Sequence, residues 1–162
     1  MTNTEKIKIH KRLTQILALC LIFVFVSCQS EQDIIDGVEK LNATCPYTLH
    51  IDSDGVVVNK VAYENHSIVF YADMDEEKVK RNIGEFSYQL VRALETSQKF
   101  TKDMIHECLS PDKEELYFKN ITDNLASNLE LTYKVILTGT ISKQTIELSM
   151  SWIDYKYMYV AK

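Results

Sequence analysis

The segment LELTYKVILTGTISKQTIELSMSW, residues 129–152, decides the fold class of this chain. Apolar side chains alternate with mostly polar ones in its first part, and the same alternation returns after a turn that contains Gly139. A period of two residues is that of a β-strand with one buried face, so the segment predicts a hairpin. The residues expected to face the core are Leu129, Leu131, Tyr133, Val135 and Leu137 in the first strand and Ile146, Leu148, Met150 and Trp152 in the second.

Three more strands are expected upstream of this hairpin. Residues 47–51, 56–63 and 68–72 are rich in β-branched and aromatic side chains. The turn signal SDG (53–55) separates the first two, and the polar stretch ENHS (64–67) separates the second from the third. Short strands joined by turns of a few residues predict an antiparallel meander.

Helical periodicity fills the middle of the chain. A helix is predicted over residues 75–95, with Asp75, or Asp73 together with Glu76, at its N-terminus. Because apolar residues recur there at steps of three and four, they form one stripe along the helix. The stripe consists of Val79, Ile83, Phe86, Leu90 and Leu94.

Two further helices are expected before the hairpin. One carries Phe100, Met104, Ile105, Cys108 and Leu109 at helical spacing. The next is predicted to start at Ser110 and Pro111, as an N-cap followed by a first-turn proline, and to run through Leu125. Together these elements predict an α+β fold. In it, an antiparallel sheet, made of a three-strand meander plus a C-terminal hairpin, is covered on one face by two or three helices.

The N-terminal segment has the composition of an export signal. A basic opening precedes an apolar run of 11 residues, Ile16 to Val26. A helix that spans a bilayer needs about 20 apolar residues, so this run is too short to be a transmembrane anchor. Residues 1–27 are therefore predicted to be a signal peptide. The basic opening consists of Lys6, Lys8, Lys11 and Arg12.

The end of this leader, Phe25, Val26, Ser27 and Cys28, resembles the lipobox of bacterial lipoproteins. The resemblance implies that the Cys28 thiol receives a diacylglycerol, that the leader is cut before it, and that the new amino group is acylated with a fatty acid such as palmitate. The alternative is an ordinary thiol at the end of an uncleaved anchor. The acidic stretch Gln29 to Asp33 resembles the signals that send some Bacteroidetes lipoproteins to the outer face of the outer membrane, although it also fits a solvated tether.

The mature chain divides into a tether and a single domain. Residues 28–44 are expected to be the lipidated cysteine and a polar tether, and residues 45–162 one α+β domain. The tether contains one helical stripe, Ile34, Val38 and Leu41, which could pack on the domain or remain mobile.

Two cysteines, Cys45 and Cys108, remain in the folded domain once the leader is removed. In an oxidising envelope compartment such a pair favours a disulfide, and the alternative is two separate buried thiols. The layout also resembles a group of small exported bacterial α+β domains, through Cys45 followed by Pro46 and through Cys108 shortly before Pro111. That resemblance implies a fold but no activity.

The charge of the mature chain excludes several partners. Cleavage removes four basic residues and Glu5, which leaves 14 basic and 22 acidic residues, a net charge of −8. Nucleic acids and anionic lipid headgroups both reward positive charge, so neither is an expected partner of the domain itself.

No catalytic or metal-binding pattern stands out. The turn Asp52 to Gly55 lacks the later ligands of a calcium loop, and two thiols without C-x-x-C spacing do not predict a zinc site. His50, His66 and His106 are far apart in sequence and fit surface or capping roles. No G-x-S-x-G elbow and no nucleotide-binding glycine motif occurs. We therefore expect no cofactor, no metal and no enzymatic activity.

A row of tyrosines ends the chain. Tyr155, Tyr157 and Tyr159 alternate on the strand face opposite to Trp152. Either a bulge turns them into the core, or they form an exposed surface suited to an envelope protein or a glycan. The sequence thus predicts a non-enzymatic binding or accessory domain, anchored by lipid in the bacterial envelope, at the periplasmic or surface side of the outer membrane. An immunity-type inhibitor that neutralises a basic toxin is the alternative.

Overall fold

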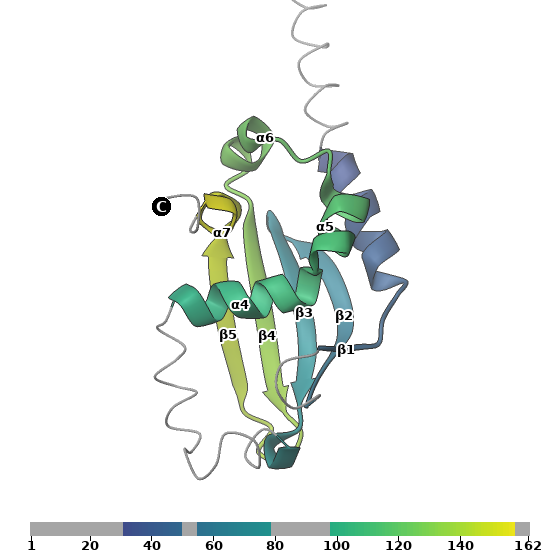
Figure 1. Ribbon diagram of the computed structural model, residues 1–162, viewed down its shortest axis with the longest axis vertical. Coiled ribbons are helices and arrows are strands. Elements are labelled where there is room, and N and C mark those ends of the chain that lie inside the picture. The colour runs from purple at the N-terminus through teal and green to yellow at the C-terminus, as the bar shows by residue number, and fades with distance from the viewer. Residues whose placement is uncertain (1–30, 50–54, 79–97, 158–162) are drawn as a thin grey trace, which may run out of the picture.

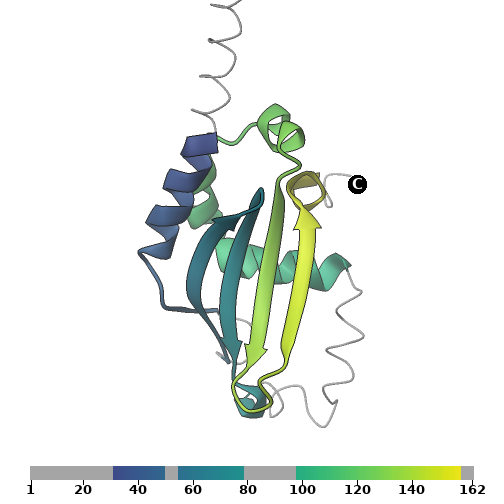
Figure 2. The same cartoon turned by 180° about the vertical axis from the view of Figure 1, so that it is seen from behind.

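A computed structural model describes residues 31–49, 55–78 and 98–157 of the chain. Their fold is α+β: a five-stranded sheet carries helices on one face and is open on the other (Figures 1 and 2). This confirms the predicted fold class. In the order β1-β2-β3-β4-β5 the strands are Tyr47–Leu49, Val56–Glu64, Ser67–Met74, Thr132–Gly139 and Thr145–Ser151.

The meander and the hairpin are joined into one sheet by a parallel pair. Strands β1, β2 and β3 pair antiparallel, as do β4 and β5, whereas β3 and β4 run parallel from Ser67 opposite Thr132 to Met74 opposite Gly139. A parallel pair needs a crossover, and here the chain between β3 and β4 includes the helices over the sheet. The sheet is therefore mixed, which the sequence pattern did not predict.

The covered face of the sheet holds the core. Along β4, Tyr133, Val135 and Leu137 are buried, and along β5, Ile146 and Leu148 are buried while the residues between them are exposed. This alternation is the one that the hairpin segment predicted, and it buries one side of each strand against the helices.

Helix α4, Gln98–Leu109, crosses the covered face of the sheet, and α5, Pro111–Phe118, follows it directly (Figure 1). Two shorter helices, α6 (Asp123–Asn128) and α7 (Trp152–Tyr157), lie near one end of the sheet. Helix α4 buries Met104, Ile105, Cys108 and Leu109, as its predicted stripe requires.

The helix expected from Ser110 through Leu125 is two helices. Helix α5 ends at Phe118, and Thr122 starts α6 by accepting a hydrogen bond on Oγ1 from the Leu125 amide at 3.3 Å. A threonine that caps a new helix competes with continuation of the old one. Leu116, within α5, is 66% exposed and does not belong to the core.

The N-terminus of the predicted helix over 75–95 is visible. The Asp75 carboxylate accepts hydrogen bonds from the amides of Glu77 and Lys78, both at 3.1 Å, so Asp75 is an N-cap as predicted. The next residue, Glu76, accepts from the amides of Ile141 and Ser142 in the β4–β5 turn, both at 2.8 Å. The stripe of Val79, Ile83, Phe86, Leu90 and Leu94 lies outside the described residues.

Residues 31–42 form a helix that belongs to the folded body rather than to a tether. Its stripe, Ile34, Val38 and Leu41, is at most 4% exposed and is part of the same core cluster as the sheet. At Gly37 the helix approaches α5 so closely that an added Cβ would lie 2.5 Å from the Tyr117 carbonyl oxygen. Of the two alternatives left open for this stripe, packing on the domain is the one that the structure shows, because the three aliphatic side chains bury one face of the helix in the core.

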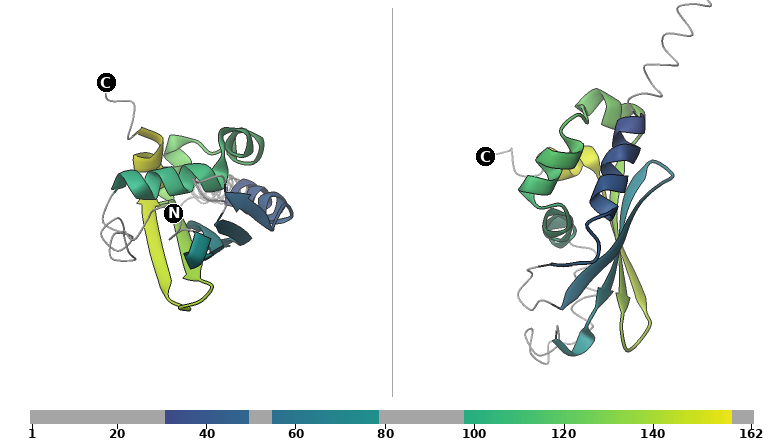
Figure 3. Two further views of the ribbon diagram at one scale, coloured as in Figure 1. Left: turned by 60° about the horizontal axis from the view of Figure 1, so that its bottom comes forward. Right: turned by 90° about the vertical axis from the view of Figure 1, so that its right-hand side faces the viewer.

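Figure 3 shows this arrangement from two further directions, with the helix over 31–42 and α5 side by side on the covered side of the sheet. Within the described ranges, no helix combines the length and apolar character that crossing a bilayer requires.

Candidate binding site between helices α4, α5 and α7

The end of the chain turns into a helix where the sequence suggested a bulged strand. Strand β5 stops at Ser151, whose hydroxyl accepts a hydrogen bond from the Asp154 amide at 3.0 Å and donates one to its carboxylate at 2.7 Å. This local cap starts α7. Because helical spacing replaces alternation, Tyr155 is 4% exposed and Tyr157 is 43% exposed. Tyr159 lies outside the described residues.

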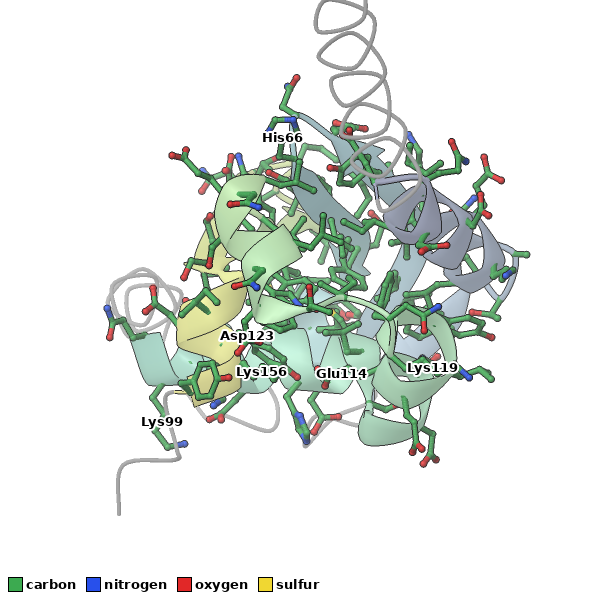
Figure 4. The ribbon with its side chains drawn as sticks, turned by 90° about the horizontal axis from the view of Figure 1, so that it is seen from above. His66, Lys99, Glu114, Lys119, Asp123 and Lys156 are labelled. Atoms are coloured by element: carbon green, nitrogen blue, oxygen red, sulfur yellow. The ribbon has the colours of Figure 1, made fainter. Side chains whose placement is uncertain are left out.

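A surface pocket of about 400 Å³ opens where α4, α5 and α7 meet. The side chains around it are polar or charged, apart from one aromatic ring, and they come from all three helices. Figure 4 shows Glu114 of α5 and Lys156 of α7 next to each other on this side of the molecule. The lining residues are Lys102, Asp103, His106, Glu114, Tyr155 and Lys156.

The Tyr155 hydroxyl lies between a histidine and a carboxylate. It is 3.4 Å from His106 Nδ1 and 3.4 Å from Glu114 Oε2. Hydrogen bonds that involve a hydroxyl are commonly about 2.7–2.8 Å long, so both contacts are weak. Burial, together with the nearby Glu114 carboxylate, raises the pKa of Tyr155 well above its usual value. The hydroxyl therefore stays protonated at neutral pH and can donate a hydrogen bond.

Charges around the pocket are matched by opposite charges close by. Lys99 pairs with Asp103 at 2.6 Å, and Lys156 pairs with Asp123 of α6 at 3.0 Å. Lys102 Nζ lies 5.6 Å from the centre of the Tyr155 ring, and its pKa is lowered by burial. The pocket thus offers hydrogen-bond donors and acceptors side by side without a strong field of one sign.

A second tyrosine lies behind the first. The rings of Tyr133 and Tyr155 pack edge to face, with centroids 5.1 Å apart and an interplanar angle of 71°. Tyr133 is fully buried, and among the described residues its hydroxyl makes no well-formed hydrogen bond, only a weak interaction with the Trp152 side chain. Burial, followed by the charge of Glu114, raises the pKa of Tyr133 well above its usual value. A buried hydroxyl without a well-formed hydrogen bond lowers the stability of the fold.

The predicted disulfide is not formed. Cys45 and Cys108 are both free thiols, Cys45 half-buried ahead of β1 and Cys108 buried on the inner side of α4. Tyr47 and Lys113 pack together in the same region: the Tyr47 hydroxyl donates to the Cys108 carbonyl at 2.8 Å, and Lys113 Nζ lies 3.3 Å from the Tyr47 ring centre. Burial raises the pKa of both thiols, so neither is an activated nucleophile.

The remaining predicted residues are dispersed. His66 is exposed at the β2–β3 turn, 3.9 Å from Glu31, whereas His106 is the histidine that reaches the pocket. Other predicted positions lie outside the described residues: Cys28, His50 and residues 52–54 of the Asp52–Gly55 turn. In the described part of the chain, no three His, Cys, Asp or Glu side chains come together as a metal ion would require.

Sequence reasoning missed most of the pocket. The sequence pattern assigned a surface or capping role to His106, which is correct for its own helix, and did not mark Glu114 as a site residue. No sequence pattern pointed to Lys102 or Lys156 as site residues. These side chains meet because α4, α5 and α7 come together at the pocket in the folded domain, and no spacing within one segment reports that contact.

No protein-family model and no curated relative matches the chain. Two solved structures are similar to it in outline. A pilotin of the type 2 secretion system of Vibrio vulnificus, EpsS, is 12% identical, covers 80% of this chain and 94% of its own, and has a TM-score of 0.43. A candidate secreted protein from Pseudomonas aeruginosa is 8% identical, covers 80% and 95%, and has a TM-score of 0.41. Likeness of this degree establishes neither a family nor a function.

Proposed function

We propose that the protein is a lipid-anchored binding domain of the bacterial envelope and that it recognises a polar ligand in the pocket between α4, α5 and α7. The observation that carries this proposal is the position of the Tyr155 hydroxyl, held 3.4 Å from both His106 and Glu114. Contacts of this length can be replaced by shorter ones to a ligand, and the groups involved need little rearrangement.

The anchor in this proposal is Cys28. The residues Phe25, Val26, Ser27 and Cys28 resemble a lipobox, and the acyl chains that such a cysteine carries contribute about 0.8 kcal/mol per buried methylene. Two or more chains hold a protein stably on a membrane. The acidic residues that follow support a place at the outer membrane, on its periplasmic or surface side.

Binding fits the chemistry of the site better than catalysis does. The raised pKa of Tyr155 makes its hydroxyl a donor rather than a base, and Lys156 is held in an ion pair with Asp123. A ligand that presents both donors and acceptors would match these groups. Tyr157, 43% exposed and with its ring centre 5.9 Å from Lys156 Nζ, adds an exposed aromatic side chain near this group. A polar segment of another envelope protein, or a glycan, has these properties.

Photo-crosslinking in native membranes tests the proposal. A benzophenone amino acid replaces Tyr157, the exposed neighbour of the pocket residue Lys156, or Ile141, which is 63% exposed in the β4–β5 turn. We expect a discrete crosslinked species from position 157 and none from position 141. Purified peptidoglycan serves as the glycan probe in a parallel cosedimentation assay.

A matched pair of variants on α5 assigns the result to the pocket. Glu114→Gln changes the carboxylate that faces Tyr155, whereas Glu115→Gln changes its exposed neighbour, which does not line the pocket. The crosslink or the cosedimentation should weaken in Glu114→Gln and persist in Glu115→Gln. Equal behaviour of the two variants would show that the ligand is held elsewhere.

A further inference from the structure

We propose that one end of the domain rests directly on the lipid headgroups and gives the protein a fixed orientation on the membrane. This end consists of the start of the helix over 31–42, the β2–β3 turn (64–67) and residues 119–130, and we call it the membrane-facing end. The inference rests on the lipidation of Cys28 in the proposed function, and it goes further by assigning the surface that meets the bilayer.

The length of chain between the anchor and the fold carries the first step. Only Gln29 and Ser30 separate Cys28 from Glu31, the first described residue. An extended chain covers at most about 3.6 Å per residue, so three steps from Cys28 to Glu31 span no more than about 11 Å. The polar layer on each side of a bilayer is roughly 5–7 Å thick. Glu31 therefore cannot move far from the headgroups.

The second step is that Glu31 belongs to the folded body. It lies in a helix whose Ile34 and Leu41 side chains are fully buried in the core. The Glu31 carboxylate also accepts a hydrogen bond from the Tyr63 hydroxyl at 3.1 Å and lies 3.9 Å from His66. Glu31 is thus attached to strand β2 and to the β2–β3 turn, so a short link from Cys28 to Glu31 is a short link to the whole domain.

The same end of the molecule carries α6 and the α6–β4 connection. The Thr132 amide donates to the His66 carbonyl at 3.1 Å, and the Leu131 amide donates to the Ala126 carbonyl at 2.8 Å. Figure 1 shows α6, the β2–β3 turn and the start of the helix over 31–42 at one end of the sheet, and Figure 4 looks onto that end, with His66 and Asp123 labelled. The β4–β5 turn lies at the opposite end.

The chemistry of the membrane-facing end fits a headgroup layer rather than the hydrocarbon. In the β2–β3 turn and residues 119–130, every fully exposed side chain is polar. The exposed charged side chains of this end are the acids Asp33, Glu64 and Glu130 and the basic residues His66 and Lys119. Such a surface pairs with zwitterionic headgroups, whose ammonium and phosphate groups take both signs, and does not insert among acyl chains.

This orientation places the β4–β5 turn farther from the bilayer than the β2–β3 turn and the pocket. Strand β3 pairs along eight residues of β4, and at about 3.3 Å per residue this puts the β4–β5 turn roughly 25 Å farther from the bilayer than the β2–β3 turn. The pocket is connected to the membrane-facing end through the pair of Lys156 with Asp123. A ligand in the pocket would therefore be bound close to the membrane.

Depth-dependent fluorescence quenching tests the orientation. The full-length protein, purified from bacterial membranes, carries a fluorophore on a bioorthogonal side chain at Asn65 or at Ile141. It is placed in phosphatidylethanolamine vesicles that contain a lipid with a nitroxide on its headgroup. We expect several-fold stronger quenching at Asn65 than at Ile141. Insertion of ten Gly and Ser residues between Ser30 and Glu31 should remove most of that difference, because the domain could then turn freely.

Mass spectrometry of the same preparation separates the two proposals. A diacylglycerol on Cys28 together with equal quenching at the two positions would overturn the orientation and leave the lipid anchor in place. A Cys28 without acyl chains would overturn both, because the short link would then have nothing to hold it to the bilayer.

Discussion

The helix over 31–42 and helix α7 are both short terminal segments that close the core, and they do so by different means. The first buries three aliphatic side chains and makes a close contact with α5 at Gly37. The second buries Trp152 and Tyr155 but is also held by polar groups, with its cap at Ser151 and with Lys156 and Tyr157 both bound to Asp123. Dense aliphatic packing tolerates change poorly, whereas an exposed polar contact contributes little and is sensitive to pH.

The largest effect is expected from removing a buried aliphatic side chain from the helix over 31–42. Leu41→Ala removes a fully buried side chain and should lower the free energy of unfolding by about 2–5 kcal/mol. Urea denaturation followed by circular dichroism measures the loss. Lys40→Ala, at the exposed neighbouring position, is the control and should change stability little. An equally small change in both variants would show that residues 31–42 do not pack into the core.

Gly37→Ala tests how closely this helix meets α5. The new methyl group would lie 2.5 Å from the Tyr117 carbonyl oxygen, which is backbone and cannot move aside alone. Overpacking of this kind costs about 1–3 kcal/mol, more than the gain of up to about 1 kcal/mol from the better helix propensity of alanine. Asp36→Ala, exposed on the same helix, is the control. A higher stability of Gly37→Ala than of the parent in urea would contradict the close contact between this helix and α5.

On the α7 side, Tyr133→Phe should leave stability unchanged or raise it by about 1 kcal/mol, because it removes a buried hydroxyl that makes no well-formed hydrogen bond. Its matched control is Tyr47→Phe, which removes a hydroxyl that donates to the Cys108 carbonyl and should lower stability by about 1 kcal/mol. Thermal unfolding of the two variants in parallel measures the contrast. A loss in Tyr133→Phe equal to that in Tyr47→Phe would show that the Tyr133 hydroxyl makes a well-formed hydrogen bond.

Tyr157→Ser should change the free energy of unfolding by no more than about 0.5 kcal/mol, because this side chain is 43% exposed. Tyr155→Ser, at a buried position of the same helix, should cost several times more. Chemical denaturation measures both variants. Collapse of the domain in Tyr157→Ser would mean that this tyrosine, like Tyr155, is part of the core.

The smallest effect is expected from lowering the pH, which protonates Asp123. Hydrogen bonds from Tyr157 and Lys156 hold the pKa of Asp123 below its usual value. A depressed pKa in the folded state means that the contact stabilises α7 above the usual carboxylate pKa of about 4 and is lost as the pH falls below it. The amide chemical shifts of Lys156 and Tyr157 should therefore change in this acid range, and Asp123→Asn should remove the part of that change that comes from this contact. Asp36→Asn, on the helix over 31–42, is the control and should leave the change at Lys156 and Tyr157 in place.

Local patterns predicted the parts of the fold that depend on neighbours in sequence. The alternation in residues 129–152 identified the hairpin, and the stripe from Phe100 to Leu109 identified α4. Asp75 was recognised as a cap because a cap acts on amides two and three residues away. By contrast, the register of β3 against β4 joins residues about 65 positions apart, and the break before Thr122 depends on where α5 must end. No periodicity reports such choices.

The site was less predictable than the fold. Tyr155 and Tyr157 were singled out, but an alternating pattern assigned them to one face, whereas the cap at Ser151 places one in the core and the other at the surface. Cys45 and Cys108 were expected to pair from their compartment alone, and their placement around Tyr47 leaves them as separate thiols. Glu114 and Lys156 became neighbours through packing of α5 and α7.

By itself, the sequence determined most of the strands and helices, the apolar face of the hairpin strands, and an acidic composition behind a leader that resembles a lipobox. These follow from side-chain period, composition and short contiguous motifs, which are properties of the chain before it folds. Only the tertiary structure decided that residues 31–42 enter the core, that β3 and β4 run parallel, and that five charged or polar side chains meet beside Tyr155. Each of these depends on which distant surfaces bury one another, and that is set by packing of the whole domain rather than by any single segment.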